Sequence, residues 1–377
     1  KIVCLDEHGN LVHHEIVYPH PPQNEKIKAI TSVSSMLEKY GIQAIAIGNG
    51  TASRETEDFI KRVPLPDGCK VFVVSEDGAS IYSASDVARE EFPDEDVTVR
   101  GAVSIGRRLM DPLAELVKID PKSLGVGQYQ YDVDQALLKE KLDNTVEICV
   151  NTVGVNLNTA SSYLLSYVSG IGPALAANIV KKRTEDGGFR SRKDLLGVSR
   201  LGGKAFEQCA GFLRIPGAEN PLDNSAVHPE CYHIVDKMAA DLGVSASDLV
   251  GNQEMCKKIN PEKYVEGDFG LPTINDILKE LAKPGRDPRA AAQEFSFADD
   301  IHSIEDLQEG MEIPGIVTNI TAFGAFVDVG VHENGLIHVS QMGRRDGKVT
   351  LKLHQHVMVK VIGVDLDRSR ISLRLVR

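Results

Sequence analysis

Residues 315–330 of this 377-residue chain read GIVTNITAFGAFVDVG, two apolar runs rich in β-branched residues on either side of a short turn. In the second run Val327 and Val329 share one face of a strand, and Phe326 takes the opposite face. Short runs of this kind continue towards the C-terminus, separated by Gly, Asp and Asn. Residues 309–377 are therefore predicted to form a small all-β barrel or sandwich.

The predicted outer face of this strand holds an aromatic residue. A large ring that points away from the core gains little from folding, so Phe326 indicates a function. Phe323, just before the strand, and His338, on the next strand, can join it, and Arg370 adds a positive charge. Flat rings beside a cation suit the stacking of single-stranded bases. The alternative is that both phenylalanines belong to the core.

The charges are divided unevenly along the chain. The formal net charge is −12, but residues 151–216 carry net +5 and residues 309–377 carry net +2. Residues 1–150 carry net −9 and residues 217–308 carry net −10. Two basic segments in an acidic protein are compatible with nucleic-acid binding, but charge fluctuates along any chain. The motifs inside the basic segments have to decide the question.

The first basic segment contains a repeated turn between predicted helices. The first copy is Gly170-Ile171-Gly172, followed on the next helix by Lys181 and Lys182. The second copy, about thirty residues later, is Leu201-Gly202-Gly203, followed by Lys204. Such a turn lets two helices meet closely, and its backbone N–H groups form a site for a phosphate oxygen. The pair resembles a tandem helix-hairpin-helix domain, which grips nucleic-acid backbones; the alternative is a turn that merely joins two core helices.

The first 122 residues predict an α/β layer domain. A strand hairpin precedes alternating strands and helices, which is the order of the RNase H-like fold, with its first strand expected before Lys1. Enzymes of this fold hold two Mg²⁺ with three or four carboxylates, one of them at the tip of the fourth strand. Here that tip is Gly48-Asn49-Gly50, which has no acid. The last helix offers Asp111, but Asp111 precedes Pro112 and suits a helix N-cap.

These features predict no catalytic residue, no metal site and no enzyme activity. The alternative is a metal-dependent nuclease whose missing carboxylate lies upstream. No run approaches the ~18 apolar residues of a membrane span, and no basic-then-apolar leader opens the chain. The six cysteines form no C-x-x-C pair, so neither a disulfide framework nor a zinc knuckle is expected. We expect a cytoplasmic protein with no cofactor and no membrane contact.

The C-terminal segment resembles the OB-type RNA-binding repeat of ribosomal protein S-one over residues 310–377. Carried over by motif, the binding positions are Phe323, Phe326, His338, Asp365 and Arg370. The turn between Asp365 and Arg370 is longer than usual for this repeat. Pro314, near the start of the first strand, indicates an edge or a bulge.

The whole chain resembles the bacterial Tex family of transcription accessory proteins. The resemblance rests on the domain order and on the strings IGNGTASRE (47–55), LGVGQYQ (124–130), NLNTAS (156–161) and AGFLRIP (210–216). Tyr131 stands where the family is expected to have His. The family also carries a large helical N-terminal region, so the chain is expected to be a C-terminal fragment.

The resemblance implies both a domain layout and a function. The implied layout is a YqgF/RuvC-like domain (1–122), a connecting segment (123–157), a tandem helix-hairpin-helix domain (158–216), a helical segment (217–308) and an OB-fold RNA-binding domain (309–377). The implied function is a non-catalytic nucleic-acid-binding factor in transcription. Its expected partner is RNA or DNA, above all single-stranded, together with the transcription machinery. A protein scaffold whose acidic segments dock basic partners is a further alternative.

Overall fold

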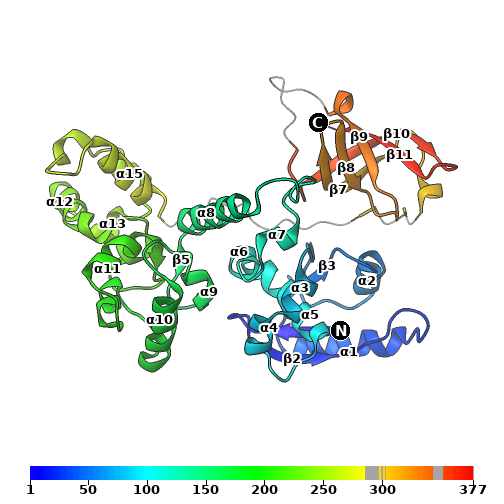
Figure 1. Ribbon diagram of the computed structural model, residues 1–377, viewed down its shortest axis with the longest axis horizontal. Coiled ribbons are helices and arrows are strands. Elements are labelled where there is room, and N and C mark those ends of the chain that lie inside the picture. The colour runs from blue at the N-terminus through cyan, green and yellow to red at the C-terminus, as the bar shows by residue number, and fades with distance from the viewer. Residues whose placement is uncertain (285–296, 299, 302, 343–350, 377) are drawn as a thin grey trace. The chain divides into compact units, whose positions relative to one another are not determined.

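The computed structural model describes residues 1–284, 297–298, 300–301, 303–342 and 351–376 (Figure 1). The chain divides into two compact units, one made of Lys1–Asp77 with Ala292–Arg377 and the other of Gly78–Ala291. The first unit combines an α/β segment with an all-β segment, and the second unit is mostly helical. This is the multidomain combination of α/β, all-α and all-β segments that the sequence predicts.

The first unit opens with a β-hairpin and a parallel strand pair. β1 (Ile2–Leu5) and β2 (Leu11–Glu15) pair antiparallel. α1 (Lys26–Lys39), β3 (Ala44–Gly48), α2 (Ser53–Ile60) and β4 (Lys70–Val74) follow, and β3 pairs with β4 in parallel. The hairpin and the parallel pair form separate two-stranded sheets over a core that includes Val33, Met36, Ile47 and Phe59. Within the described residues the hairpin pairs with no third strand.

The second unit begins with helices around a buried ionic cluster. These helices are α3 (Ala79–Ala84), α4 (Asp86–Glu91), α5 (Val97–Met110), α6 (Pro112–Leu116), α7 (Pro121–Leu124) and the long α8 (Gln135–Val153). Lys118 Nζ lies 2.8 Å from a carboxylate oxygen of Glu91 and 2.8 Å from one of Glu115. The Tyr82 hydroxyl donates a hydrogen bond to Glu91. The cluster therefore ties α3, α4 and α6 together.

Residues 155–214 form two helical pairs around one core. In order they are β5 (Val155–Asn156), α9 (Ser162–Leu165), α10 (Pro173–Asp186), the 3-10 helix η1 (Arg192–Gly197), α11 (Gly203–Cys209), η2 (Ala210–Phe212) and β6 (Leu213–Arg214). β5 and β6 pair in parallel, so the two ends of the segment meet. The core between the helices includes Leu157, Leu165, Ile179 and Leu195.

A third helical segment follows and is fixed to the hairpins by a buried arginine. Its helices are η3 (Pro221–Asn224), η4 (Pro229–Cys231), α12 (Tyr232–Leu242), α13 (Ala246–Leu249), α14 (Gln253–Cys256), η5 (Pro261–Tyr264) and α15 (Leu271–Ala282). Arg192 of η1 is fully buried. Its guanidinium donates to the Leu213 and Val227 carbonyls at 2.7 Å each and to the Tyr232 hydroxyl at 2.9 Å. These bonds satisfy a buried charge and join the two segments.

The C-terminal segment is a closed barrel, not a sandwich. After η6 (Ile304–Asp306) come β7 (Glu312–Thr321), β8 (Gly324–Asp328), β9 (Gly335–His338), η7 (Val339–Gln341), β10 (His356–Asp365) and β11 (Arg370–Leu375). The hydrogen-bonded order is β10-β11-β9-β8-β7, and β7 pairs with β10 to close the barrel. β9 and β11 run parallel, and the other pairs are antiparallel. Fully buried side chains such as Val317, Val327, Val359 and Leu373 fill the interior.

Within the first unit, Arg54 of α2 contacts the C-terminal segment. Its Nη1 donates to the Gly330 carbonyl at 2.5 Å, and its Nη2 donates to the Ala298 carbonyl at 2.7 Å. Its guanidinium also lies over the Phe297 ring, 5.8 Å from the centroid. A Cβ on Gly330 would come 2.0 Å from Arg54 Nη1, so this contact requires glycine at that position.

Candidate nucleic-acid interface

The outer side of β8 carries an aromatic pair. Ala325 and Val327 are fully buried inside the barrel, and Phe326 between them is half-buried because it points the other way. Phe323, in the turn before β8, is 51% exposed. The two rings meet edge to face, with centroids 6.1 Å apart and planes at 88°. An exposed ring is thus braced by a second ring, and the strand alternation predicted from the sequence is confirmed.

His338 ends β9 next to this pair. It is the register partner of Gly324, the residue after Phe323. Its Nδ1 lies 2.9 Å from Ser340 Oγ, and the Val339 N–H donates to the Phe323 carbonyl at 2.9 Å. These bonds hold the imidazole beside the Phe323 turn. The structure therefore brings Phe323, Phe326 and His338 together, and their binding role stays a prediction.

Asp365 and Arg370 lie at another place on the barrel. They face each other across β10 and β11, and both are exposed. β11 runs parallel to β9, with Ser372 in register with Leu336. Arg370 precedes Ser372, whereas His338 follows Leu336, so the two residues lie towards opposite ends of the strand pair. Four residues of strand, about 13 Å, separate the register positions of Arg370 and His338. The Asp365–Arg370 pair is thus set apart from the His338 end.

The pairing of β9 with β11 also places a positively charged residue, Arg374, that is not among the motif positions of the RNA-binding repeat. Continuing the parallel pairing of Leu373 with Ile337 by one residue places Arg374 beside His338. Arg374 is exposed because the alternation of β11 sends Ile371 and Leu373 inward. That alternation is readable from the sequence, but the identity of the strand beside β11 is not.

Two titratable groups on the barrel have shifted pKa values. Burial raises the pKa of the Asp328 carboxyl, and a hydrogen bond from the Gly330 N–H at 2.8 Å and the charge of Arg54 offset this only in part. Burial lowers the pKa of the His356 imidazole. Both shifts have one cause, the exclusion of water, and both favour the neutral form.

The two helical turns share one backbone geometry. Gly170 has φ of +79°, and Arg200 at the equivalent position has φ of +69°. The apolar residue that follows donates its N–H to the carbonyl three residues earlier, at 2.9 Å from Ile171 and at 3.1 Å from Leu201. The helix after each turn then begins on an extended glycine. The repeat seen in the sequence is therefore a repeat in structure.

Ile171 and Leu201 anchor these turns in the core between the helices. Their side chains are 3% and 5% exposed, and their N–H groups are used inside the turns. The apolar residue of each turn fills the core between the helices, and the predicted contact of Ile171 and Leu201 with nucleic acid stays a prediction. Open space surrounds the Cα atoms of Gly172, Gly202 and Gly203.

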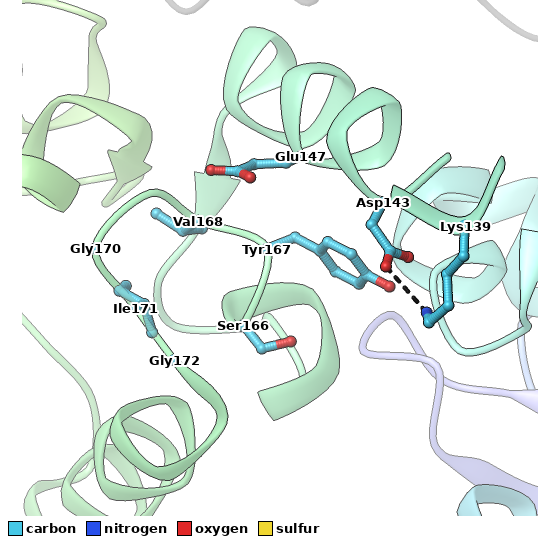
Figure 2. A pocket seen from close by; sticks show the side chains of 9 residues that line it. All are labelled: Lys139, Asp143, Glu147, Ser166, Tyr167, Val168, Gly170, Ile171 and Gly172. Atoms are coloured by element: carbon cyan, nitrogen blue, oxygen red, sulfur yellow. Dashed lines mark hydrogen bonds and ion pairs between the residues drawn. The ribbon is translucent and has the colours of Figure 1, made fainter. Parts of the chain in front are cut away.

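One pocket is lined both by the first turn and by charged side chains of α8 (Figure 2). The turn Gly170–Gly172 lines a pocket to which α8 contributes Lys139, Asp143 and Glu147. Lys139 Nζ lies 2.9 Å from an Asp143 oxygen. The α8 side of the pocket therefore carries two carboxylates and one ammonium group, a net negative charge. This charge disfavours the binding of a phosphate at the first turn. The sequence around the turn does not predict these acidic neighbours, because α8 lies earlier in the chain.

The predicted lysines differ in their surroundings. Lys181 lies 3.9 Å from Glu185, and Lys182 lies 2.8 Å from Asp186. The hydrogen bond to Asp186 and the charge of that carboxylate raise the pKa of Lys182. Lys204, near the start of α11, has no ion-pair partner among the residues that the structure describes. The second turn therefore carries the less opposed positive charge.

Comparison with known proteins assigns these parts. Four family models match in order: Tex protein YqgF-like domain at residues 1–110, helix-hairpin-helix motif at 150–214, HHH domain at 220–289 and S1 RNA binding domain at 306–375. The transcriptional accessory protein Tex of Neisseria gonorrhoeae is 53% identical over 382 residues, which cover 100% of this chain and 50% of that protein. This chain belongs to the Tex family.

Other relatives extend the family. Protein YhgF of Escherichia coli (strain K12) is 52% identical over 382 residues, covering 100% of this Tex-family chain and 49% of that protein. The human S1 RNA-binding domain-containing protein 1 is 35% identical over 446 residues, covering 100% of the chain and 44% of that protein. The chain spans about half the length of the curated relatives it matches.

Two residues considered for a nuclease site, Asn49 and Asp111, each have a structural role in this Tex-family chain. The Asn49 Oδ1 at the tip of β3 accepts the Glu76 N–H at 3.0 Å. Asp111 Oδ1 accepts the N–H groups of Leu113 and Ala114 at 3.1 and 3.2 Å, so its interpretation as an N-cap is confirmed. In the described part of the chain, no three His, Cys, Asp or Glu side chains gather as metal ligands.

Two further observations concern the surface of the Tex-family chain. Over the described ranges, no helix is long and apolar enough to cross a membrane. Tyr131 is 77% exposed in the loop between α7 and α8, and Tyr129 beside it is 68% exposed. Gln130 between them is buried, and its Oε1 accepts the Val126 N–H at 2.9 Å. The loop is thus built around the Gln130 amide, with both rings outside.

Proposed function

We propose that this chain is a non-catalytic nucleic-acid-binding factor that acts in transcription, with the barrel as its single-strand site. The observation that carries the proposal is the exposed Phe323 ring, braced by Phe326 and flanked by His338. Each base stacked on such a ring contributes ~1–3 kcal/mol. The names of two relatives, a transcriptional accessory protein and an S1 RNA-binding domain-containing protein, support the same function. A cytoplasmic location and contact with the transcription machinery belong to this proposal.

Stacking supplies most of the barrel's affinity in this proposal. Residues 309–377 carry net +2 only, and salt screens exposed charges over about 10 Å. Every base has a face that stacks, so the site tolerates different sequences. The barrel is therefore expected to bind single strands of RNA or DNA in preference to duplexes, whose bases are already stacked.

The second helical turn is the proposed contact to the sugar-phosphate backbone. Gly202 and Gly203 have open space around them, and Lys204 follows with no acidic partner among the described residues. The first turn shares a pocket with Asp143 and Glu147. Contacts to phosphates position a protein on nucleic acid without reading its sequence. The hairpins are therefore expected to add affinity to every sequence alike.

No catalytic role is proposed for the YqgF-like domain. Asn49 stands at the end of β3, where enzymes of the RNase H-like fold have a carboxylate, and Asp111 caps a helix. The purified chain should leave labelled RNA and DNA intact with Mg²⁺ or Mn²⁺. Cleavage that disappears in Asp111→Asn would overturn this and favour the metal-dependent nuclease.

The binding proposal is tested on the whole chain by fluorescence anisotropy with single- and double-stranded RNA and DNA at several salt concentrations. Phe323→Ala with Phe326→Ala should weaken single-strand binding by ~2–5 kcal/mol. Met358→Ala is the matched control, because Met358 is an apolar side chain, 45% exposed, on strand β10. Equal affinities of the wild type, the control and the double variant would contradict the aromatic site.

A further inference from the structure

A row of side chains crosses the outer side of the barrel at the level of His338. β8 pairs with β9 at Gly324 and His338, and β10 pairs with β11 at Lys360 and Arg374. The parallel register of β9 and β11 places Arg374 beside His338. The order across the sheet is therefore Gly324, His338, Arg374 and Lys360. Three strand spacings separate its ends, about 14 Å.

The row begins at the aromatic pair and ends in positive charge. Phe323 directly precedes Gly324 and is half exposed. Arg374 and Lys360 both point outward, because their neighbours Leu373, Val359 and Val361 are buried inside the barrel. The next row along the strands is different, since it contains Phe326, Leu336 and Ser372 and carries no charge. Among the described residues of the barrel, positive charge therefore follows the exposed ring across β9 and β11.

Arg374 is held in a position that suits a phosphate. Its Nε donates to Gln341 Oε1 at 2.6 Å, and Gln341 lies in η7 directly after His338. Among the described residues, that is the partner of its guanidinium, so the two Nη groups are left for another acceptor. A planar guanidinium binds a phosphate through two parallel N–H bonds. The Gln341 contact fixes the edge of the guanidinium and lowers the entropy lost on binding.

Two other cations on β10 and β11 each stand near an acid. Arg370 stands directly opposite Asp365 across β10 and β11. Lys360 Nζ lies 3.5 Å from a Glu312 oxygen. No carboxylate lies within ion-pair distance of Arg374 in the ranges that the structure describes. Arg374 is therefore the less opposed cation, and it is also the one beside the exposed ring and His338.

We propose that a single strand stacked on Phe323 continues across β9 and β11, with its next phosphate bound by the Arg374 guanidinium and the following one near Lys360. This inference rests on the proposed function of the barrel and gives the bound strand a direction. The ligand is the phosphodiester backbone of single-stranded RNA or DNA. The Asp365–Arg370 pair lies off this path.

The test compares two exposed arginines of the barrel, Arg374 and Arg368, in variants of the whole chain. Arg374→Gln should lower the affinity for oligouridylate about tenfold, and it should reduce the slope of log affinity against log salt by about one. Arg368→Gln, an exposed arginine in the turn between β10 and β11, is the matched control and should change affinity less than threefold. Because a phosphate contact does not read bases, the loss at Arg374 should be the same for oligouridylate and oligoadenylate.

Phe323→Ala, measured in parallel, separates two kinds of failure. If Phe323→Ala weakens binding but Arg374→Gln does not, or if both arginine variants lose equally, the path is overturned and the aromatic site stands. If the wild-type chain does not bind single strands, the proposed function and the path both fall. Arg374→Lys, which keeps the charge but not the planar fork, should recover part of the affinity. Unchanged thermal unfolding of the variants would show that these losses do not come from misfolding.

Discussion

Replacing Phe323 by alanine should weaken the binding of single strands more than it lowers the stability of the barrel. The Phe323 ring is 51% exposed, so about half of its apolar surface is in water before any ligand arrives. Full burial of a phenylalanine contributes about 1.5–3 kcal/mol, so its removal should cost the barrel about 1 kcal/mol of stability. The loss of one base stack should cost ~1–3 kcal/mol of binding free energy, a five- to 150-fold increase in Kd.

Replacing Phe326 tests whether the second ring acts as a brace. The two rings meet edge to face at 6.1 Å between centroids, a contact that contributes about 0.5–1.5 kcal/mol. Phe326→Ala should therefore weaken binding as well, and the double variant should lose less than the sum of the single losses. Anisotropy with oligouridylate and thermal unfolding of the same samples measure both quantities. Additive losses, or a Phe323→Ala variant that binds like the wild type, would refute the reasoning.

Three more predictions test other parts of the chain. Arg192→Met should destabilise the helical unit by about 3–5 kcal/mol in urea unfolding, because it leaves buried carbonyls without donors; a cost under about 1 kcal/mol would contradict this. Lys204→Glu should weaken binding of duplex DNA more than Lys182→Glu, because Lys182 already pairs with Asp186 at 2.8 Å; the reverse order in salt-dependent anisotropy would count against the second turn. Burial alone would raise the pKa of Glu91, but Lys118, Tyr82 and Arg107 lower it overall. The stability that Glu91 adds is thus present above its unfolded pKa of about 4.3 and is lost as the pH falls through its lower folded pKa. Unfolding of Glu91→Gln should therefore depend less on pH in this acid range than unfolding of the wild type, and equal dependence would exclude this role.

Local signals in the sequence decided much of the fold. The alternation in residues 324–329 places Phe326 on the outer side of its strand, because successive side chains point to opposite faces. The position of Asp111 before Pro112 predicts an N-cap, because the carboxylate reaches the free N–H groups of the first helical turn. Gly170, in the turn between α9 and α10, takes the positive φ that other residues avoid. Each of these signals acts within a few residues, so one sequence is enough to read it.

Partners from distant segments appear only in the tertiary structure. Asp143 of α8 lines the same pocket as the first turn, Arg374 lies beside His338, and Arg192 reaches the Val227 carbonyl. The sequence alone determined that this chain has an α/β segment, paired helical turns and a barrel with an aromatic outer face. Only the packing of helices decided which carboxylates share a pocket with the first turn, and only the register of strands decided which cation lies next to the Phe323 ring and His338. The physical reason is that periodicity and caps act within a segment, whereas contacts between segments depend on how all of their surfaces fit together.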